Sequence, residues 1–325
     1  MVQPYLIIVG GPTGSGKGSL PGKVIGRLGL SSSYVSIIID DLVESNPYYK
    51  VKVSAIINKL KGEEPNPVQA FLNPSPELQK EMGTAYFNAR EKVDCDTGEL
   101  CTNEHTDCDT CDTKNDENMT KAFDNGQNIV FETTMTYVPS WIMEVFEKQI
   151  AEKQYKIIIS YSVVDLCELL KRNKSRAVKS LEVFLVDPTK NPPRLPDIRE
   201  DEYKETLLDI IEVFKNLNKN PMIESNRVRL LLFDNNTNNS KVLYDNHDNH
   251  DNHDRFDKIR TGNVAIQRYY PNKSCGSVHT KFGGYKKKLN KRSKKLNKRS
   301  KRLNKRSKKL NKRSKRLNKK TKKKK

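Results

Sequence analysis

The chain has 325 residues, of which 35% are hydrophobic and 31% are charged, and its formal net charge is +20. Residues 286–325 contain 25 Lys or Arg and no acid, which leaves a net charge of −5 on the other 285 residues. No stretch approaches the roughly 20 apolar residues of a membrane span, and the start of the chain lacks the pattern of a secretion signal. We therefore expect a soluble, intracellular and cytoplasmic protein in which disulfides are not the default state of the six cysteines.

The first predicted strand, residues 5–9, runs directly into a glycine-rich loop with the sequence GGPTGSGKGS. This loop has the G-x-x-x-x-G-K spacing of a Walker A motif, and a helix is predicted to start at Lys17. Glycines let backbone N–H groups converge on a phosphate chain, the lysine reaches the β- and γ-phosphates, and the helix N-terminus favours an anion. The loop therefore predicts a site for ATP formed by Gly11, Gly14, Ser15, Gly16, Lys17, Gly18 and Ser19.

The loop departs from the usual pattern at one position. Gly18 follows the lysine, so the hydroxyl that normally holds Mg²⁺ comes one residue later, from Ser19. The sequence GGPTGSGKG resembles that of nucleoside-monophosphate kinases, which also have a glycine between the lysine and the hydroxyl residue. We predict Ser19 as a ligand of Mg²⁺.

A second strand is predicted over residues 34–39, and it ends on Asp40 and Asp41. Open parallel sheets bind their ligands at the carboxyl ends of the strands, where a carboxylate can take a proton or orient a metal-bound water. Asp41 also suits the N-cap of a following helix. The stretch IIIDDLVESNPYYK resembles zeta-toxin-type kinases, in which a strand ends in the aspartate that acts as general base, with a proline seven residues later. Pro47 assigns that role to Asp40; Asp41 is the fallback and a second candidate metal ligand.

Two helices are predicted next, over residues 51–61 and 76–92, as a layer on the acceptor side. The acidic insertion at 93–120 then carries four cysteines with a C-x-x-C half-site. They form a candidate tetrahedral zinc site of purely structural role: Cys95, Cys101, Cys108 and Cys111. The alternative that we favour is a disordered acidic loop.

The third predicted strand, residues 128–131, is followed at once by Glu132-Thr133-Thr134. Glu-x-Thr after this strand resembles the substrate site of the zeta-toxin-type kinases, which implies that Glu132 and Thr134 hold the acceptor. That family often has an arginine two residues later, where this chain has Thr136.

An amphipathic helix is predicted over residues 140–153, a fourth strand over 156–164 and a helix over 165–176. The basic segments RNKSRAVKS and NPPRLPD resemble the lid of P-loop kinases, which brings positive charge to the transferring phosphoryl group. Arg176 and Arg194 are the candidates for this catalytic role, although a cation also suits a helix C-terminus without any function. A helix over 202–217 and a fifth strand over 228–233 complete the predicted domain.

Low-complexity sequence begins near residue 236 and includes the repeat DNHDNHDNHD at 245–254. We treat residues 236–285 as a linker region. The tail, residues 286–325, repeats LNKRSK with a period of seven and is predicted to be disordered and to bind a polyanion, RNA or DNA. Nuclear or nucleolar targeting is a second role that fits such a tail.

The sequence predicts a three-layer α/β P-loop domain over residues 1–235, with a parallel five-strand sheet and helices on both faces. The resemblance to zeta-toxin-type kinases covers this domain and implies transfer of the γ-phosphoryl group of ATP to a hydroxyl. In the bacterial toxins the acceptor is a UDP-amino-sugar. Two alternatives stay open: a nucleotide or polynucleotide kinase, and a nucleic-acid-binding protein with a regulatory or decayed nucleotide site.

Overall fold

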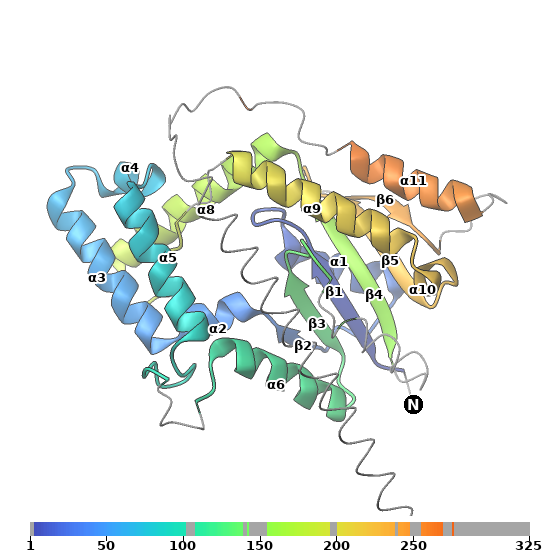
Figure 1. The fold of residues 1–325 in the computed structure, drawn as a ribbon, viewed down its shortest axis with the longest axis horizontal. Helices are drawn as coiled ribbons and strands as arrows, with labels where there is room; N and C mark the ends of the chain where they lie inside the picture. The colour runs from blue at the N-terminus through green and yellow to red at the C-terminus, as the bar shows by residue number, and fades with distance from the viewer. Residues whose placement is uncertain are drawn as a thin grey trace, which may run out of the picture. The chain divides into compact units, whose positions relative to one another are not determined.

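The computed structural model describes residues 3–101, 108–138, 142, 155–195, 200–237, 240–247, 255–268 and 275. Its centre is a six-stranded sheet with the order β2-β3-β1-β4-β5-β6 (Figure 1). The pairs among the first five strands are parallel and β6 pairs with β5 antiparallel. The strands are β1 Tyr5–Gly10, β2 Val35–Ile37, β3 Ile129–Thr133, β4 Lys156–Val163, β5 Val228–Asp234 and β6 Lys241–Asp245.

Helices cover both faces of this sheet, because alternate residues of the buried strands point to opposite sides. In β1, Leu6 and Ile8 pack with α6 (Cys111–Asp124) and α9 (Glu200–Asn218). Ile7 and Val9 pack on the other face with α1 (Leu20–Leu28). The predicted three-layer α/β class, with helices on both faces of a largely parallel sheet, is confirmed.

A separate group of helices lies to one side of the sheet and has its own apolar core (Figure 1). Tyr49, Phe71 and Leu181 are among its buried residues. Its helices are α2 Ile39–Ser45, α3 Pro47–Glu63, α4 Pro67–Leu72, α5 Pro76–Glu91 and α8 Leu166–Val186. We call this group the helical lobe.

A helix cap explains why α3 starts earlier than the sequence predicted. The side chain of Asn46 accepts hydrogen bonds from the backbone N–H groups of Tyr48 and Tyr49, and Pro47 occupies the first helical position. Helix α3 therefore starts four residues before the predicted 51. Asp40 lies in the first turn of α2, because β2 ends at Ile37 instead of 39.

The sheet extends beyond the predicted boundary at residue 235. Strand β6 and helix α11 (Arg255–Gln267) fall in the segment 236–285, yet β6 pairs with β5 and α11 packs on α9. The buried carboxylate of Asp245 fixes this edge, because Arg229 donates to it at 2.6 Å and Arg27 of α1 at 3.1 Å. A short helix, α10 (Pro221–Glu224), links α9 to β5.

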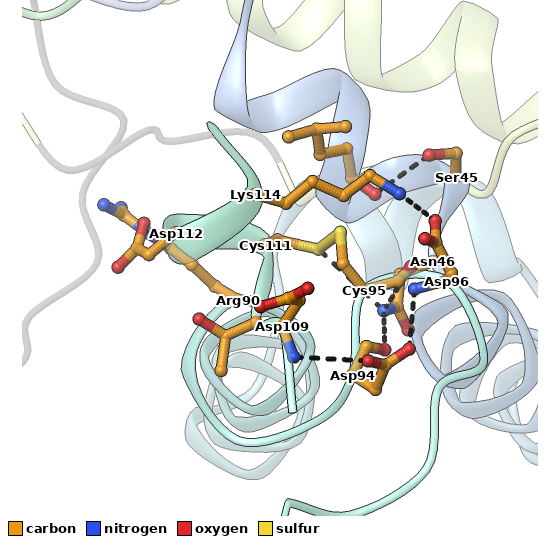
Figure 2. The surroundings of a disulfide bond; sticks show 12 residues. Ser45, Asn46, Arg90, Asp94, Cys95, Asp96, Asp109, Cys111, Asp112 and Lys114 are labelled. Atoms are coloured by element: carbon orange, nitrogen blue, oxygen red, sulfur yellow. Dashed lines mark hydrogen bonds and ion pairs between the residues drawn. A yellow bond between two sulfur atoms is a disulfide. The ribbon is translucent and has the colours of Figure 1, made fainter. Parts of the chain in front are cut away.

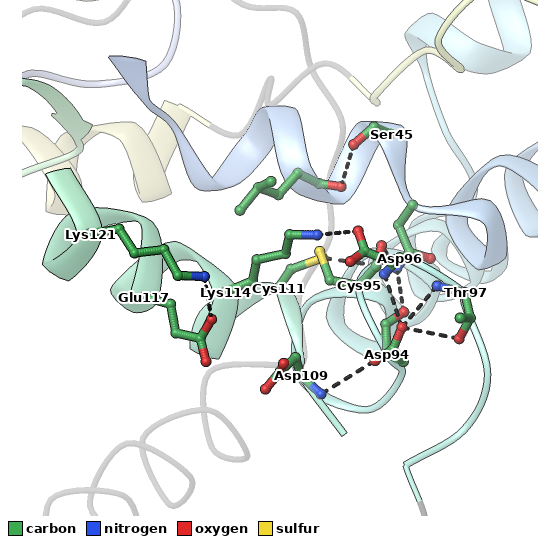
Figure 3. Close-up of polar contacts among 12 residues, drawn as sticks. Ser45, Asp94, Cys95, Asp96, Thr97, Asp109, Cys111, Lys114, Glu117 and Lys121 are labelled. Atoms are coloured by element: carbon green, nitrogen blue, oxygen red, sulfur yellow. Dashed lines mark hydrogen bonds and ion pairs between the residues drawn. A yellow bond between two sulfur atoms is a disulfide. The ribbon is translucent and has the colours of Figure 1, made fainter. Parts of the chain in front are cut away.

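The acidic insertion is structured where it is described. Figure 2 shows the bond Cys95–Cys111, which joins the loop after α5 to the start of α6. The buried amide of Asn46 donates to the carbonyl oxygens of Asp94 at 3.0 Å and Cys95 at 3.1 Å, so the same side chain caps α3 and holds this loop. Lys114 on α6 pairs with Asp96 across the loop (Figure 3). This part of the insertion is therefore packed against the helical lobe, contrary to the favoured prediction of a disordered loop.

The predicted helix at 140–153, except residue 142, the DNH repeat at 248–254 and the tail lie outside the described residues. Residues 1–275 and 276–325 form separate units. In the described ranges, no helix has both the length and the apolar composition of a membrane span.

Candidate functional site

The glycine-rich loop connects β1 to a 3₁₀ turn, Lys17–Ser19, that leads into α1. Gly11, Gly14 and Gly16 have φ values of 148°, 84° and 82°, which lie in the region that favours glycine. A Cβ atom on Gly16 would lie 2.2 Å from Nδ2 of Asn235. The backbone therefore takes a bent form that only glycine adopts easily at these positions, which is compatible with a phosphate-binding loop.

Side chains that are distant in the sequence donate hydrogen bonds to backbone carbonyl oxygens of the glycine-rich loop. The carbonyl oxygen of Ser15 accepts hydrogen bonds from Oγ of Ser162 at 2.6 Å and from Nδ2 of Asn235 at 2.7 Å. The hydroxyl of Tyr203 donates to the carbonyl oxygen of Thr13 at 2.9 Å. Sequence reasoning missed these residues. The signal for Asn235 was its position directly after β5, at the carboxyl edge of the sheet.

Lys17 is buried and points back over the loop. Its Nζ donates to the carbonyl oxygen of Gly11 at 2.9 Å and lies 3.7 Å from Oε1 of Glu132. Burial lowers the pKa of Lys17, and the nearby Arg176 acts in the same direction, while Glu132 and Asp40 oppose the shift. The two carboxylates supply the partners that a buried ammonium group requires.

The predicted metal ligands are Ser19, at the end of the glycine-rich loop, and Asp41, on α2, and both are exposed. Oγ of Ser19 donates to the carbonyl oxygen of Gly16 at 3.0 Å, and a Cβ atom on Gly18 would meet nothing within 4 Å. Asp41 is exposed in the first turn of α2. Burial and the neighbouring Asp40 raise the pKa of Asp41, against the effect of Arg194. No group of three or more His, Cys, Asp or Glu side chains that fits a metal ion occurs within the described residues.

Asp40 is held by two donors from other parts of the chain. The hydroxyl of Tyr86, on α5, donates to its Oδ1, and Nη1 of Arg194 lies 2.7 Å from its Oδ2. Burial alone would raise the pKa of Asp40, but Arg194, Tyr86 and Lys17 stabilise the charged form, and the pKa lies below its ordinary value. Arg194 also pairs with Glu44 one turn along α2. The structure thus places this predicted lid arginine on the candidate base.

Glu132 and Thr134 lie where β3 ends, next to the glycine-rich loop. Glu132 is half-buried, and burial raises its pKa although Lys17 opposes the shift. The carbonyl oxygen of Thr134 accepts from the N–H of Gly11 at 3.3 Å, and its side chain is exposed. Met135, which follows, has a φ of 54°, a conformation that costs a non-glycine residue about 1–2 kcal/mol. This strained turn fixes the end of β3 against the loop.

The second predicted arginine, Arg176, is exposed on α8 and acts electrostatically on Lys17. Glu132, Asp40 and Arg176 all act electrostatically on the ammonium group of Lys17, and Glu132 lies 3.7 Å from it. Arg194 joins them through Asp40, and Tyr86 is an addition that the sequence did not indicate.

The four cysteines of the candidate zinc site do not converge on one point. They form the disulfides Cys95–Cys111 and Cys101–Cys108, and a third bond joins Cys167 to Cys275. A disulfide sulfur is not the thiolate that zinc requires, so the arrangement shown is a crosslink and not a metal site. The expectation that disulfides would not form differs from the structure, in which all six cysteines are paired.

Comparisons with known proteins add a likeness in fold. No protein-family model matches the chain, and no curated protein matches it in sequence. A solved structure of the PezAT chromosomal toxin–antitoxin system of Streptococcus pneumoniae aligns with 92% of this chain and 88% of its own, with 13% identity and a TM-score of 0.43. A likeness at this level concerns only the arrangement of the chain, so functional conclusions rest on the residues described above.

Proposed function

We propose that this protein is an ATP-dependent kinase that transfers the γ-phosphoryl group to a hydroxyl of a small-molecule acceptor. The observation that supports it most is the position of Lys17, on a glycine loop shaped for phosphates, 3.7 Å from the carboxylate of Glu132 and within the electrostatic influence of Asp40. Phosphoryl transfer needs this pairing of a phosphate cradle with a carboxylate beside it, because catalysis consists mainly of positioning and charge stabilisation.

In the proposed reaction the acceptor oxygen attacks the γ-phosphorus, and the bond to the β–γ bridging oxygen breaks to release ADP. The carboxylate of Asp40 takes the hydroxyl proton, and Glu132 and Thr134 place the acceptor. Both oxygens of Asp40 are engaged by Tyr86 and Arg194. Each carboxylate oxygen can accept a further hydrogen bond, so the acceptor hydroxyl can bind Asp40 while Tyr86 and Arg194 hold it, and Arg194 then offsets charge beside the transferring group.

Lys17 and the loop N–H groups hold the phosphates, and Arg176 offsets the charge that develops on them. Mg²⁺ bound together with ATP would neutralise negative charge on the phosphates. Ser19 and Asp41 are the residues that would contact it, which suits an ion that keeps most of its water and is bound by few protein groups.

The test is Mg²⁺-dependent consumption of ATP against a panel of UDP-sugars, nucleosides, nucleotides and 5′-hydroxyl oligonucleotides, with product masses measured. The expected result is one added phosphate on one acceptor class, lost in Lys17→Ala and Asp40→Asn. Asp209→Asn, at an exposed aspartate of α9 outside the proposed site, is the matched control and retains the activity. Binding of ATP without any product, in the wild type and in Asp40→Asn alike, would overturn the proposal.

A further inference from the structure

A basic groove of about 700 Å³ lies between α9 and α11. Among the residues whose side chains the structure describes, four cations line it, together with two amide side chains and one valine, and none of these is an acid. The cations are Lys215, Lys219, Arg260 and Arg268.

Helical spacing explains why these cations share one groove. Lys215 lies on α9 and Lys219 directly follows its last residue, Asn218, so the two lysines are four residues apart at the end of that helix. On α11, Arg260 and Val264 are also four apart, and Arg268 follows four residues later, just past the end of the helix. Each helix thus presents a row of cations, and the two rows flank the groove.

The groove is held by packing between the two helices. Ala265 and Ile266 of α11 are buried beneath it. The amide of Asn218 donates to Oδ1 of Asn263 at 3.3 Å, and its oxygen accepts from the hydroxyl of Tyr244 at 2.7 Å. A Cβ on Gly262 would lie 2.9 Å from Nδ2 of Asn218, so glycine permits this close approach. The two rows of cations are therefore set before any ligand arrives.

The positive charge of the groove is not compensated. Across the described ranges no ion pair involves Lys215, Lys219, Arg260 or Arg268. Like charges held together by the fold repel one another, and a bound polyanion relieves that repulsion while releasing its own counterions.

We propose that this groove binds the phosphate backbone of a nucleic acid. The amides of Asn263 and Gln267 add hydrogen-bond donors for phosphate and sugar oxygens. The described lining is cationic and polar, with contacts suited to the backbone and without an aromatic ring for base stacking. Val264 is the one apolar residue in this described part of the lining, which does not suit insertion into a lipid surface.

The position of the groove leaves the kinase site accessible. Lys219 follows α9 and precedes α10 and the first residue of β5, Val228. The groove therefore lies toward the amino ends of the strands, whereas the glycine loop lies at their carboxyl ends. The proposal does not depend on the kinase activity.

The test uses the full-length protein and a single-stranded RNA or duplex DNA oligonucleotide. Lysine acetylation, measured by mass spectrometry, should show Lys215 and Lys219 protected by the oligonucleotide while the exposed Lys61 and Lys179 stay reactive. Equal reactivity of all four lysines in the bound state would overturn the proposal and assign binding to the tail alone. Protection by inositol hexakisphosphate or anionic vesicles but not by the oligonucleotide would also overturn it.

A matched pair of variants gives the second measurement. Each replaces three exposed cations by glutamine: Lys219, Arg260 and Arg268 in the groove, or Lys61, Lys80 and Lys179 elsewhere. Each phosphate contact contributes about 0.7–0.9 to the slope of log affinity against log salt. The groove variant should lower that slope by about 2 and the control by less than about 1, with phosphotransfer unchanged in both. Equal slopes for the two variants would contradict the proposed site.

Discussion

Gly16→Ala tests the shape of the phosphate loop most sharply. The φ of Gly16 is 82°, and placing a non-glycine residue in this left-handed region costs about 1–2 kcal/mol. The new Cβ would lie 2.2 Å from Nδ2 of Asn235, so that amide must move away and its bond to Ser15 breaks. Such a bond contributes about 1 kcal/mol net. The free energy of unfolding should fall by about 2–3 kcal/mol.

Thermal unfolding followed by circular dichroism measures this loss, which should lower Tm by about 4–12 °C. Calorimetry with ADP should show a Kd at least about tenfold higher, because the loop N–H groups no longer converge. Gly22→Ala on α1 is the control, because its Cβ enters open space. It should be neutral or stabilise the protein by up to about 1 kcal/mol. Wild-type Tm and ADP affinity in Gly16→Ala would refute the loop geometry.

Three further predictions follow from contacts outside the loop. Asn235→Ala removes the donor to the carbonyl oxygen of Ser15. Its main effect should be a higher Kd for ADP, with only a small change in Tm. Arg194→Ala removes the cation that holds the pKa of Asp40 low, so this pKa rises and the acid limb of kcat/KM moves to higher pH. Replacing Cys95 and Cys111 by serine opens a crosslink between residues 16 apart, which should lower the free energy of unfolding by about 3 kcal/mol in denaturant titrations.

Arg194→Ala has a matched control variant, and for each of the three changes one result would contradict the reasoning. For the arginine, Arg90→Ala breaks a comparable 2.7 Å pair with Asp112 on the insertion and should leave the pH profile in place. An unchanged profile in Arg194→Ala would show that Asp40 is not the group that titrates. For the cysteines, intact mass should show six hydrogens fewer than the reduced chain, and a fully reduced native protein would contradict the three disulfides. For Asn235→Ala, an ADP affinity equal to that of the wild type would show that Asn235 does not support the glycine-rich loop.

The elements that the sequence predicted well are those that depend on neighbouring residues. The apolar run before the glycine loop, the loop spacing and the carboxylates that follow the second and third apolar runs are local patterns, although β2 ends at Ile37 and Asp40 lies in the first turn of α2. The rule that parallel strands present ligand groups at their carboxyl ends then places Asp40 and Glu132 near Lys17 without coordinates. The structure brings these three side chains together.

The contacts that the sequence did not predict join residues far apart in the chain. Asn235 meets Ser15 across 220 positions, and Tyr86 meets Asp40 across 46. Strand β6 was missed because its five residues, KVLYD, lie among polar repeats and have no long apolar run. The disulfides were missed because cysteine pairing depends on tertiary distance: Cys167 and Cys275 are 108 positions apart.

The most direct test of the proposed kinase follows the γ-phosphoryl group itself, using ATP labelled with ¹⁸O on the terminal phosphate. Mass spectrometry of the reaction with the acceptor found in the panel should show a product carrying three ¹⁸O atoms, in the wild type and in the control Asp209→Asn. Lys17→Ala and Asp40→Asn should give no labelled acceptor. Label that appears only in inorganic phosphate, or labelled acceptor at wild-type rates in Asp40→Asn, would contradict a kinase that uses Asp40 as its base.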